Sequence, residues 1–345
     1  MYTAPAMRRG AWRAAWPIGL LVGLLWLVTP AEACGCGAVI AREGDANVTQ
    51  ERALIQWDGR TEHIVMELGV EGRSDEAAWI VPVPAPATVQ LGDPDLFATL
   101  QELTKPRITY NWYFIGGLGG GGATGGAAPP PVTMLDRQTL GPLDVSTLAA
   151  TDATALSDWL AVNGYTFSPA LGHVLQYYVD NGWFYVAVKL VPGVAEQALT
   201  GTLDPLWLTF ETPQMVYPMR PSSLARGGLR VVLYVVADHR VRNPIIKIVQ
   251  NPSEVAYAQW IDPATLEADS PLRPFVPHQQ FLTKIDAWIA EPKFISSDFM
   301  FAYAVQDDTY RATETRTINV GAPLCFAVLG VCIVGFLIVA WRSRL

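Results

Sequence analysis

Residues 53–70 read ALIQWDGRTEHIVMELGV, two apolar runs rich in β-branched residues on either side of a short polar interruption. Asp58 and Gly59 lie in that interruption, and Asp-Gly is a strong signal for a hairpin because glycine accepts the positive φ that tight turns require. The stretch therefore predicts two antiparallel strands, 53–57 and 63–70, joined at Asp58, Gly59 and Arg60.

Further strands are predicted on both sides of this hairpin. Residues 229–236 (LRVVLYVV) are almost uninterruptedly apolar, which favours a central strand that is buried on both faces. Residues 77–83 run into Pro82, Pro84 and Pro86, and because proline cannot donate to a ladder we expect an edge strand or an exit from the sheet there. The other predicted strands are 108–115, 132–140, 143–149, 183–191, 207–211, 281–289 and 299–305.

Three helices are expected between the strands. The first covers 94–103 with Asp93 as its cap, and the second follows Asp152 and ends at Asn163-Gly164. The third begins at Ser168-Pro169, and its apolar face comprises Leu171, Val174, Leu175 and Tyr178. Strands with a few inserted helices predict an α+β, strand-rich mixed body.

Both ends of the chain carry membrane signals. Residues 1–33 have a basic start, an apolar stretch at 18–28 and a small-residue cleavage site at 31–33, as a secretory signal peptide has. Residues 324–341 are an uncharged run long enough to cross a bilayer, so a transmembrane helix is predicted over 323–341, with a short cytoplasmic tail at 342–345. The basic residues of both ends then lie on the cytoplasmic side. We expect a single-pass plasma-membrane protein with an extracytoplasmic body at 34–322.

Composition narrows the class of partner. The 345 residues include 12 Trp, 12 Tyr and 12 Phe, enough for a packed core, and the net charge is −8. Five of the basic residues lie in the two end segments, so the body is more acidic than the whole chain, which argues against nucleic acid as a partner. Residues 116–131 are rich in glycine and proline and predict a flexible loop within the body.

Cysteine chemistry centres on Cys34 and Cys36, which open the expected mature chain as C-x-C. Three states are compatible with this pair: a disulfide between the two, lipidation of Cys34, and free or externally paired thiols. Cys325 and Cys332 lie in the predicted membrane helix, where they are expected to pack as small apolar side chains.

The candidate polar site is Asp238-His239-Arg240, directly after the strand 229–236. An aspartate beside a histidine could orient a general base, although neighbouring residues of an extended chain point to opposite faces. The alternative is an ion-paired strand exit. Asp45, Asn47 and Thr49 imitate the start of a calcium loop, but Gln50 and Gln56 stand where glycine and glutamate belong. No catalytic residue, metal ligand or cofactor site is predicted.

Several phrases in order resemble a known bacterial family. They are WIVPVP (79–84), LSDWL (156–160) with Asn163-Gly164-Tyr165, FYVAVKL (184–190), Pro218-Met219-Arg220 and VVADHR (235–240). Together they resemble the domain of unknown function 2330 family over most of residues 34–305. The resemblance implies a secreted protein, often with a C-terminal membrane helix, and brings no reaction, cofactor or catalytic residue.

The expected function is a membrane-anchored, non-enzymatic interaction domain of the bacterial cell envelope, with an envelope protein as partner. Two alternatives remain: a binding module for glycans or small solutes, and an envelope hydrolase of an unfamiliar type. The aromatic strand 108–115 bears on the glycan alternative, because its rings could stack on sugars or fill a core.

Overall fold

The computed structural model describes residues 38–43, 45–74, 76–113, 144–149, 153–166, 168–190, 201–244, 253–319 and 342. Several predicted features lie outside these residues: the signal segment 1–33, Cys34 and Cys36, the loop 116–131, the strand 132–140, Asp152 and the apolar segment 323–341. Among the helices that are described, none combines the length and the apolar character needed to cross a membrane.

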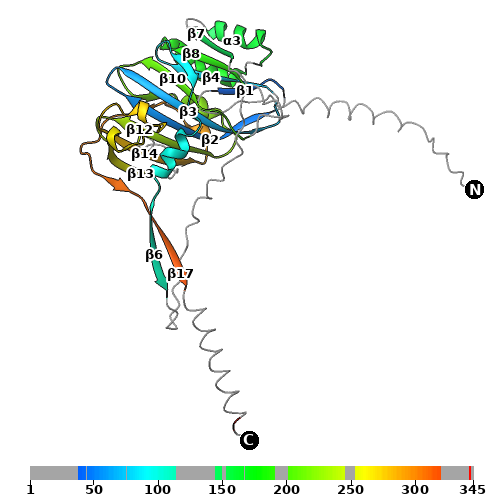
Figure 1. Cartoon of the computed structure of the whole chain (residues 1–345). Helices are drawn as coiled ribbons and strands as arrows, with labels where there is room; N and C mark the ends of the chain where they lie inside the picture. Colours follow the sequence, from blue (N-terminus) through cyan, green and yellow to red (C-terminus); the bar gives the residue numbers. More distant parts are fainter. Residues whose placement is uncertain are drawn as a thin grey trace, which may run out of the picture.

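Two sheets dominate the described part of the chain (Figure 1). The nine-stranded sheet has the order β16 (Tyr310–Arg311), β13 (Ser253–Ile261), β14 (Gln280–Ile289), β12 (Leu229–Ala237), β2 (Ala46–Trp57), β3 (Thr61–Gly72), β10 (Leu206–Glu211) and β5 (Thr88–Leu91), with β9 (Gly201–Thr202) also pairing with β3. The four-stranded sheet has the order β1 (Ala38–Ala41), β4 (Ala77–Val83), β8 (Phe184–Leu190) and β7 (Asp144–Ala149).

The helices and short pieces surround these sheets. The α-helices are α2 (Leu96–Leu103), α3 (Ala153–Val162) and α4 (Pro169–Asp180), and the 3-10 helices are η2 (Arg220–Leu224), η4 (Pro263–Thr265), η5 (Arg273–Phe275) and η6 (Pro292–Phe294). Two further strand pairs are β11 (Val216–Tyr217) with β15 (Phe299–Met300), and β6 (Arg107–Tyr113) with β17 (Thr313–Asn319).

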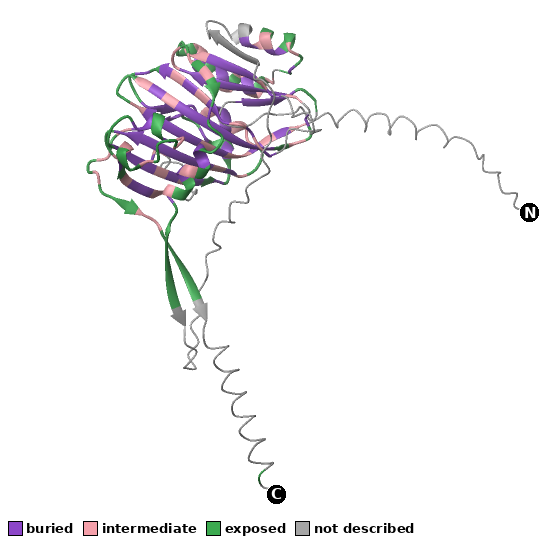
Figure 2. Cartoon of the chain, in the orientation of Figure 1, coloured by how far each residue is buried: buried purple, intermediate pink, exposed green. Residues whose placement is uncertain are grey.

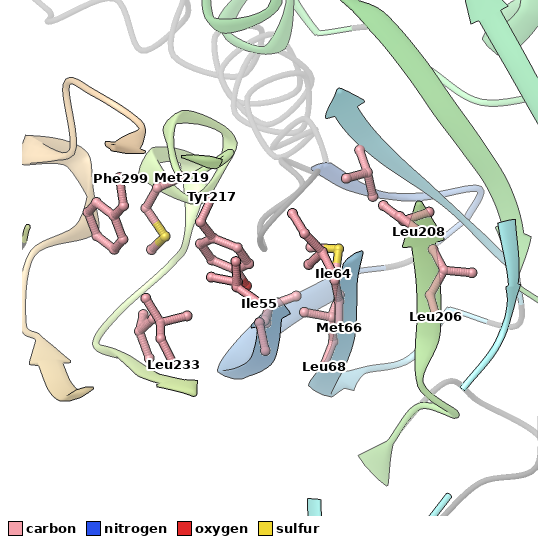
Figure 3. Close-up of a cluster of buried hydrophobic side chains, with 14 of the residues drawn as sticks. Ile55, Ile64, Met66, Leu68, Leu206, Leu208, Tyr217, Met219, Leu233 and Phe299 are labelled. Carbon is pink, nitrogen blue, oxygen red and sulfur yellow. The ribbon is translucent and has the colours of Figure 1, made fainter. Parts of the chain in front are cut away.

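Three apolar layers hold this arrangement together. The largest lies between the two sheets, and Figure 3 shows part of it, with Ile55 beside Tyr217 and Ile64 beside Met66. A second layer lies between the four-stranded sheet and helices α3 and α4. The third covers the opposite face of the nine-stranded sheet with α2 and the segment around η5. The strand-rich α+β prediction is confirmed for the described residues.

The hairpin prediction is confirmed, with both strands longer than the sequence pattern indicated. β2 and β3 pair antiparallel from Trp57–Glu62 to Ala46–Gly72, with a bulge between Val48 and Gln50. Gly59 has φ 99°, as the turn requires. The Asp58 carboxylate accepts from Thr61 N at 2.7 Å and from Arg60 N at 3.0 Å, and these bonds hold the pKa of Asp58 below its usual value.

The central position of the strand 229–236 is also confirmed. β12 lies between β14, which runs antiparallel to it, and β2, which runs parallel. Leu233 and Val235 face the layer between the sheets, while Tyr234 and Val236 face α2. Burial on both faces explains the unbroken apolar run.

Of the two alternatives predicted for residues 77–83, the edge strand is wrong, because β4 lies between β1 and β8, whereas the exit from the sheet is confirmed, because β4 ends at Val83, directly before Pro84. Its described pairing with β1 ends at Ile80, whereas its pairing with β8 continues through Pro82 to Val83. Pro82 therefore has no pairing partner among the described residues of β1. Its lack of an N–H costs no hydrogen bond to those residues. All seven residues of β4 are buried.

The helices follow their predicted signals, with one correction at a cap. Ser168 caps α4 and accepts a hydrogen bond from Leu171 N at 3.1 Å. Of the predicted apolar face of α4, Leu171, Leu175 and Tyr178 are buried. At α2 the cap is Asp95 rather than Asp93, because Asp93 instead accepts from Asp95 N at 2.8 Å within the preceding turn. The predicted strand 299–305 is reduced to β15.

β6 and β17 form a two-stranded parallel ribbon that stands away from the body (Figures 1 and 2). Residues 107–111 and 313–317 are exposed throughout, including Ile108 and Tyr110. Residues 108–111 of the predicted aromatic strand therefore do not contribute to the core. Hydrogen bonds from Arg107 N to Ala312 O and from Ala312 N to Ala256 O fasten the near end of the ribbon to β13.

Glu62 is a carboxyl group within the layer between the sheets. It is fully buried on β3 and accepts from Val216 N at 3.1 and 3.2 Å through its two oxygens. Burial raises the pKa of Glu62 well above its usual value. Between the pKa of Glu62 in the unfolded chain and its higher pKa in the folded protein, the folded protein keeps a proton that the unfolded chain releases. The free energy of unfolding therefore falls as pH rises through this interval.

Glu62→Gln removes this titration and keeps an acceptor for Val216 N. We expect the wild type to lose up to about 1.4 kcal/mol per pH unit relative to the variant as pH rises from about 4.3, the usual pKa of an unfolded glutamate. Urea unfolding of both proteins over a pH series measures this difference. Parallel curves for the two proteins would show that Glu62 does not carry the effect.

Candidate functional site

A groove of about 880 Å³ lies on the body between α4, η2 and the segment that begins with η6. Its walls include His173 and Tyr177 from α4, Arg220 and Ser223 from η2, and Lys293 from η6. The remaining lining residues are Pro169, Ala170, Val174, Gln176, Asp180, Leu224, Ile295 and Ser296. This volume lies in the range of small-molecule sites.

Arg220 is the most constrained charged side chain of this groove. Its guanidinium lies 3.6 Å from the centre of the Tyr177 ring, which is a close cation–π contact. Its Nε is buried, has no hydrogen-bond partner among the described residues, and lies 3.6 Å from Asp298 Oδ2, which is too long for a hydrogen bond. Arg220 is thus held in one orientation by packing.

Buried carboxylates hold the short helix that carries Arg220. Asp298 accepts from Arg220 N at 3.0 Å and from the Tyr178 hydroxyl at 2.7 Å, so it joins η2 to α4. Burial raises the pKa of Asp298, against the opposing effect of these bonds. From the sheet side, Ser222 donates to Glu51 Oε1 at 2.7 Å, and both residues are fully buried.

The other charged groups near the groove have partners of their own. Lys293 pairs with Glu291 at 2.7 Å, and both side chains are exposed. Asp180 accepts from Gln176 at 2.8 Å along α4. Exposed pairs of this kind contribute little to stability and exchange readily for other partners.

The predicted polar cluster lies at the far end of β12, and its members do not form a pair with each other. Asp238 contacts His278 Nε2 at 2.9 Å, and His239 Nδ1 lies 2.8 Å from Asp307 Oδ2. Arg240 donates through its backbone N to Asp307 Oδ1 at 2.8 Å. Asp238 and His239 therefore do not contact each other, because successive side chains diverge, and each contacts a residue from another segment of the chain.

The contact between His239 and Asp307 leads to a testable prediction for Asp307. The hydrogen bond with His239 is the main cause that lowers the pKa of Asp307. His239→Gln is expected to raise that pKa toward the usual aspartate value, whereas His278→Gln, which alters the neighbouring pair, leaves it unchanged. Carboxyl-carbon NMR titration measures both. Equal shifts of the Asp307 pKa in the two variants would contradict the pairing of Asp307 with His239 rather than with His278.

The remaining sequence candidates fall in different places. Asn47 exchanges hydrogen bonds with the backbone of Arg226, and the Thr49 hydroxyl contacts Gly69 O at 3.5 Å. Among the residues with described positions, no three His, Cys, Asp or Glu side chains gather as a metal site would need. Cys34 and Cys36 lie outside those residues, and Tyr110 lies on the exposed ribbon.

The groove was not predicted from the sequence. Arg220 stands in the Pro218-Met219-Arg220 phrase, which signals a family likeness but no chemistry. Its partners Tyr177 and Asp298 lie 43 residues before and 78 residues after it along the chain, so no local spacing connects them.

Comparisons with known proteins agree with the sequence resemblance. No curated protein matches the chain. Among solved structures, the crystal structure of baculovirus P35 matches at 10% identity and a TM-score of 0.37, covering 80% of this chain and 99% of that chain. A TM-score at this level does not establish a common fold. The model of the family described as "Uncharacterized protein conserved in bacteria (DUF2330)" matches residues 30–302, and the chain therefore belongs to the domain of unknown function 2330 family.

Proposed function

We propose that this chain is a non-enzymatic binding domain of the bacterial envelope, displayed outside the plasma membrane on a C-terminal membrane helix. The observation that carries the proposal is the exposed β6–β17 ribbon, whose second strand precedes the apolar segment in the sequence. The apolar run begins at Leu324, five residues after the last paired residue of β17, Asn319.

The ribbon has the form of a stalk. Seven residue pairs run from Thr313–Arg107 to Asn319–Tyr113, and at about 3.3 Å per residue they extend roughly 20 Å. An isolated two-stranded ribbon is marginally stable in water. A stalk between the body and the membrane explains the presence of this ribbon better than a contribution to the core. A tether at its far end would hold the body, with its groove, clear of the lipid surface.

The parallel pairing brings Tyr113 and Asn319, the last described residues of the two strands, to the same end of the stalk. Residue 116, the start of the Gly/Pro-rich segment, follows Tyr113 closely, and Pro323 follows Asn319 closely. Because Tyr113 and Asn319 pair, the Gly/Pro-rich segment would leave the ribbon near the membrane entry point. A Gly/Pro-rich segment at that place suits lateral contact with a membrane protein partner.

In-cell crosslinking and pull-down tests this proposal. Full-length protein is compared with a chain that ends at Ala322, both expressed at equal levels. We expect full-length protein to sediment with membranes and to capture a stoichiometric envelope protein, and the shortened chain to be released. Sedimentation of both chains to the same extent would contradict the tether, and turnover of a generic hydrolase substrate by the purified protein would contradict the non-enzymatic role.

A further inference from the structure

We propose that the groove between α4, η2 and η6 binds a small organic anion, whose carboxylate or phosphate oxygens pair with the Arg220 guanidinium and whose apolar part lies against Val174 and Ile295. This binding site lies on the body, and the inference does not depend on the membrane tether.

The first argument is that Arg220 is prepared as an anion receptor. Tyr177 covers one face of the guanidinium, and Asp298 accepts a hydrogen bond from the backbone of Arg220. Less conformational entropy of the Arg220 side chain is therefore lost when a ligand binds. Among the described residues, the buried Nε of Arg220 has no hydrogen-bond partner, and its nearest carboxylate oxygen, Asp298 Oδ2, lies 3.6 Å away. A guanidinium in this state has a planar fork of donors available for carboxylate or phosphate.

The second argument is that Asp298, the ion-pair partner of Arg220, contacts the guanidinium at its buried Nε. Its Oδ1 already accepts from Tyr178 and from the backbone of Arg220, and its Oδ2 lies 3.6 Å from Arg220 Nε. The carboxylate is behind the guanidinium, at the buried Nε, rather than at the groove side. It therefore orients the cation and leaves the outer nitrogens for a ligand.

The third argument is the character of the groove walls. Lys293 adds a second cation, and its exposed contact with Glu291 can be exchanged at little free-energy cost. Val174 and Ile295 supply apolar surface, and Ser223 supplies a hydroxyl. Asp180 is the carboxylate on the lining, and its bond from Gln176 occupies one of its oxygens. A ligand with one anionic end and an apolar body matches these walls.

The test is calorimetric titration of the full-length protein in neutral detergent. The probes are benzoate, phenyl phosphate and inorganic phosphate. We expect benzoate or phenyl phosphate to bind with one-site stoichiometry, and the better of the two identifies carboxylate or phosphate as the anionic group. Inorganic phosphate, which lacks the apolar part, is expected to bind more weakly. Failure of both aromatic probes to bind would overturn the proposal.

Variants assign the binding to Arg220. Arg220→Gln is expected to weaken binding by about tenfold or more, as loss of a charge-assisted hydrogen bond does. The control is Arg226→Gln, which makes the same charge change six residues away, outside this groove, and is expected to leave the affinity unchanged. Equal weakening by both variants, or none by Arg220→Gln, would overturn the assignment.

A third variant, Lys293→Gln, tests the site even if Arg220→Gln fails to fold. Lys293→Gln changes an exposed side chain on the opposite wall, so folding is not at issue. It is expected to weaken binding by about twofold to fivefold, as a solvent-exposed charge contact does. Unchanged affinity in Lys293→Gln together with an unfolded Arg220→Gln, judged by near-ultraviolet circular dichroism, would count against this site.

Discussion

Trp79→Ala is expected to lower the free energy of unfolding by about 3–5 kcal/mol, among the largest effects of any single substitution in this chain. Trp79 is 1% exposed and lies in the middle of β4, between Val39 of β1 and Val188 of β8. Its side chain fills the layer between the two sheets. Truncation to alanine removes a large buried apolar surface and leaves a cavity that two hydrogen-bonded neighbours prevent from closing.

Urea unfolding of wild type and variant measures this loss. The matched control is Trp288→Ala on β14, whose indole is 45% exposed and packs beside Gly228, so that a clearly smaller loss is expected. Equal losses for the two tryptophans would contradict the placement of Trp79 at the centre of the core.

Arg52→Met is expected to destabilise the protein by about 3–5 kcal/mol, because it breaks a buried ion pair by removing the cation. Arg52 and Glu67 face each other across β2 and β3 and form a salt bridge, with side chains 14% and 4% exposed. The guanidinium also lies 5.4 Å from the ring of Phe97, which belongs to α2 above the sheet. Loss of Arg52 therefore affects both the ion pair and the contact with α2.

The double variant Arg52→Met/Glu67→Leu separates the two contributions. Replacing both partners with apolar side chains removes the buried carboxylate together with its cation, so most of the lost stability is expected to return. A double variant as unstable as Arg52→Met alone would show that the contact with Phe97, rather than the ion pair, carries the effect. Urea unfolding of the wild type, Arg52→Met, Glu67→Leu and the double variant completes the cycle.

The sequence predicted the elements whose residue pattern is set by burial on one or two faces. The hairpin of β2 and β3 and the central strand β12 follow from apolar periodicity and one Asp-Gly turn. β13 was missed because the bulge between Val255 and Tyr257 interrupts its alternation. β17, which reads TETRTIN, was missed because an exposed strand has no apolar face to detect.

The candidate groove could not be predicted for a different reason. Tertiary packing of η2, α4 and the segment after η6 brings together Arg220, Tyr177 and Asp298. None of these three residues belongs to a motif with a known spacing. Asp238 and His239, in contrast, are adjacent in sequence and attracted attention for that reason. Their side chains bind His278 and Asp307 on separate segments instead.

Protease accessibility in cells tests the central claim of a body displayed outside the plasma membrane. Proteinase K is added to intact cells, or to spheroplasts where an outer membrane is present, expressing the chain with an epitope tag after Leu345. The account predicts that the body is digested while the tag survives on a short membrane fragment until detergent is added. Protection of the body until the membrane is lysed would contradict it.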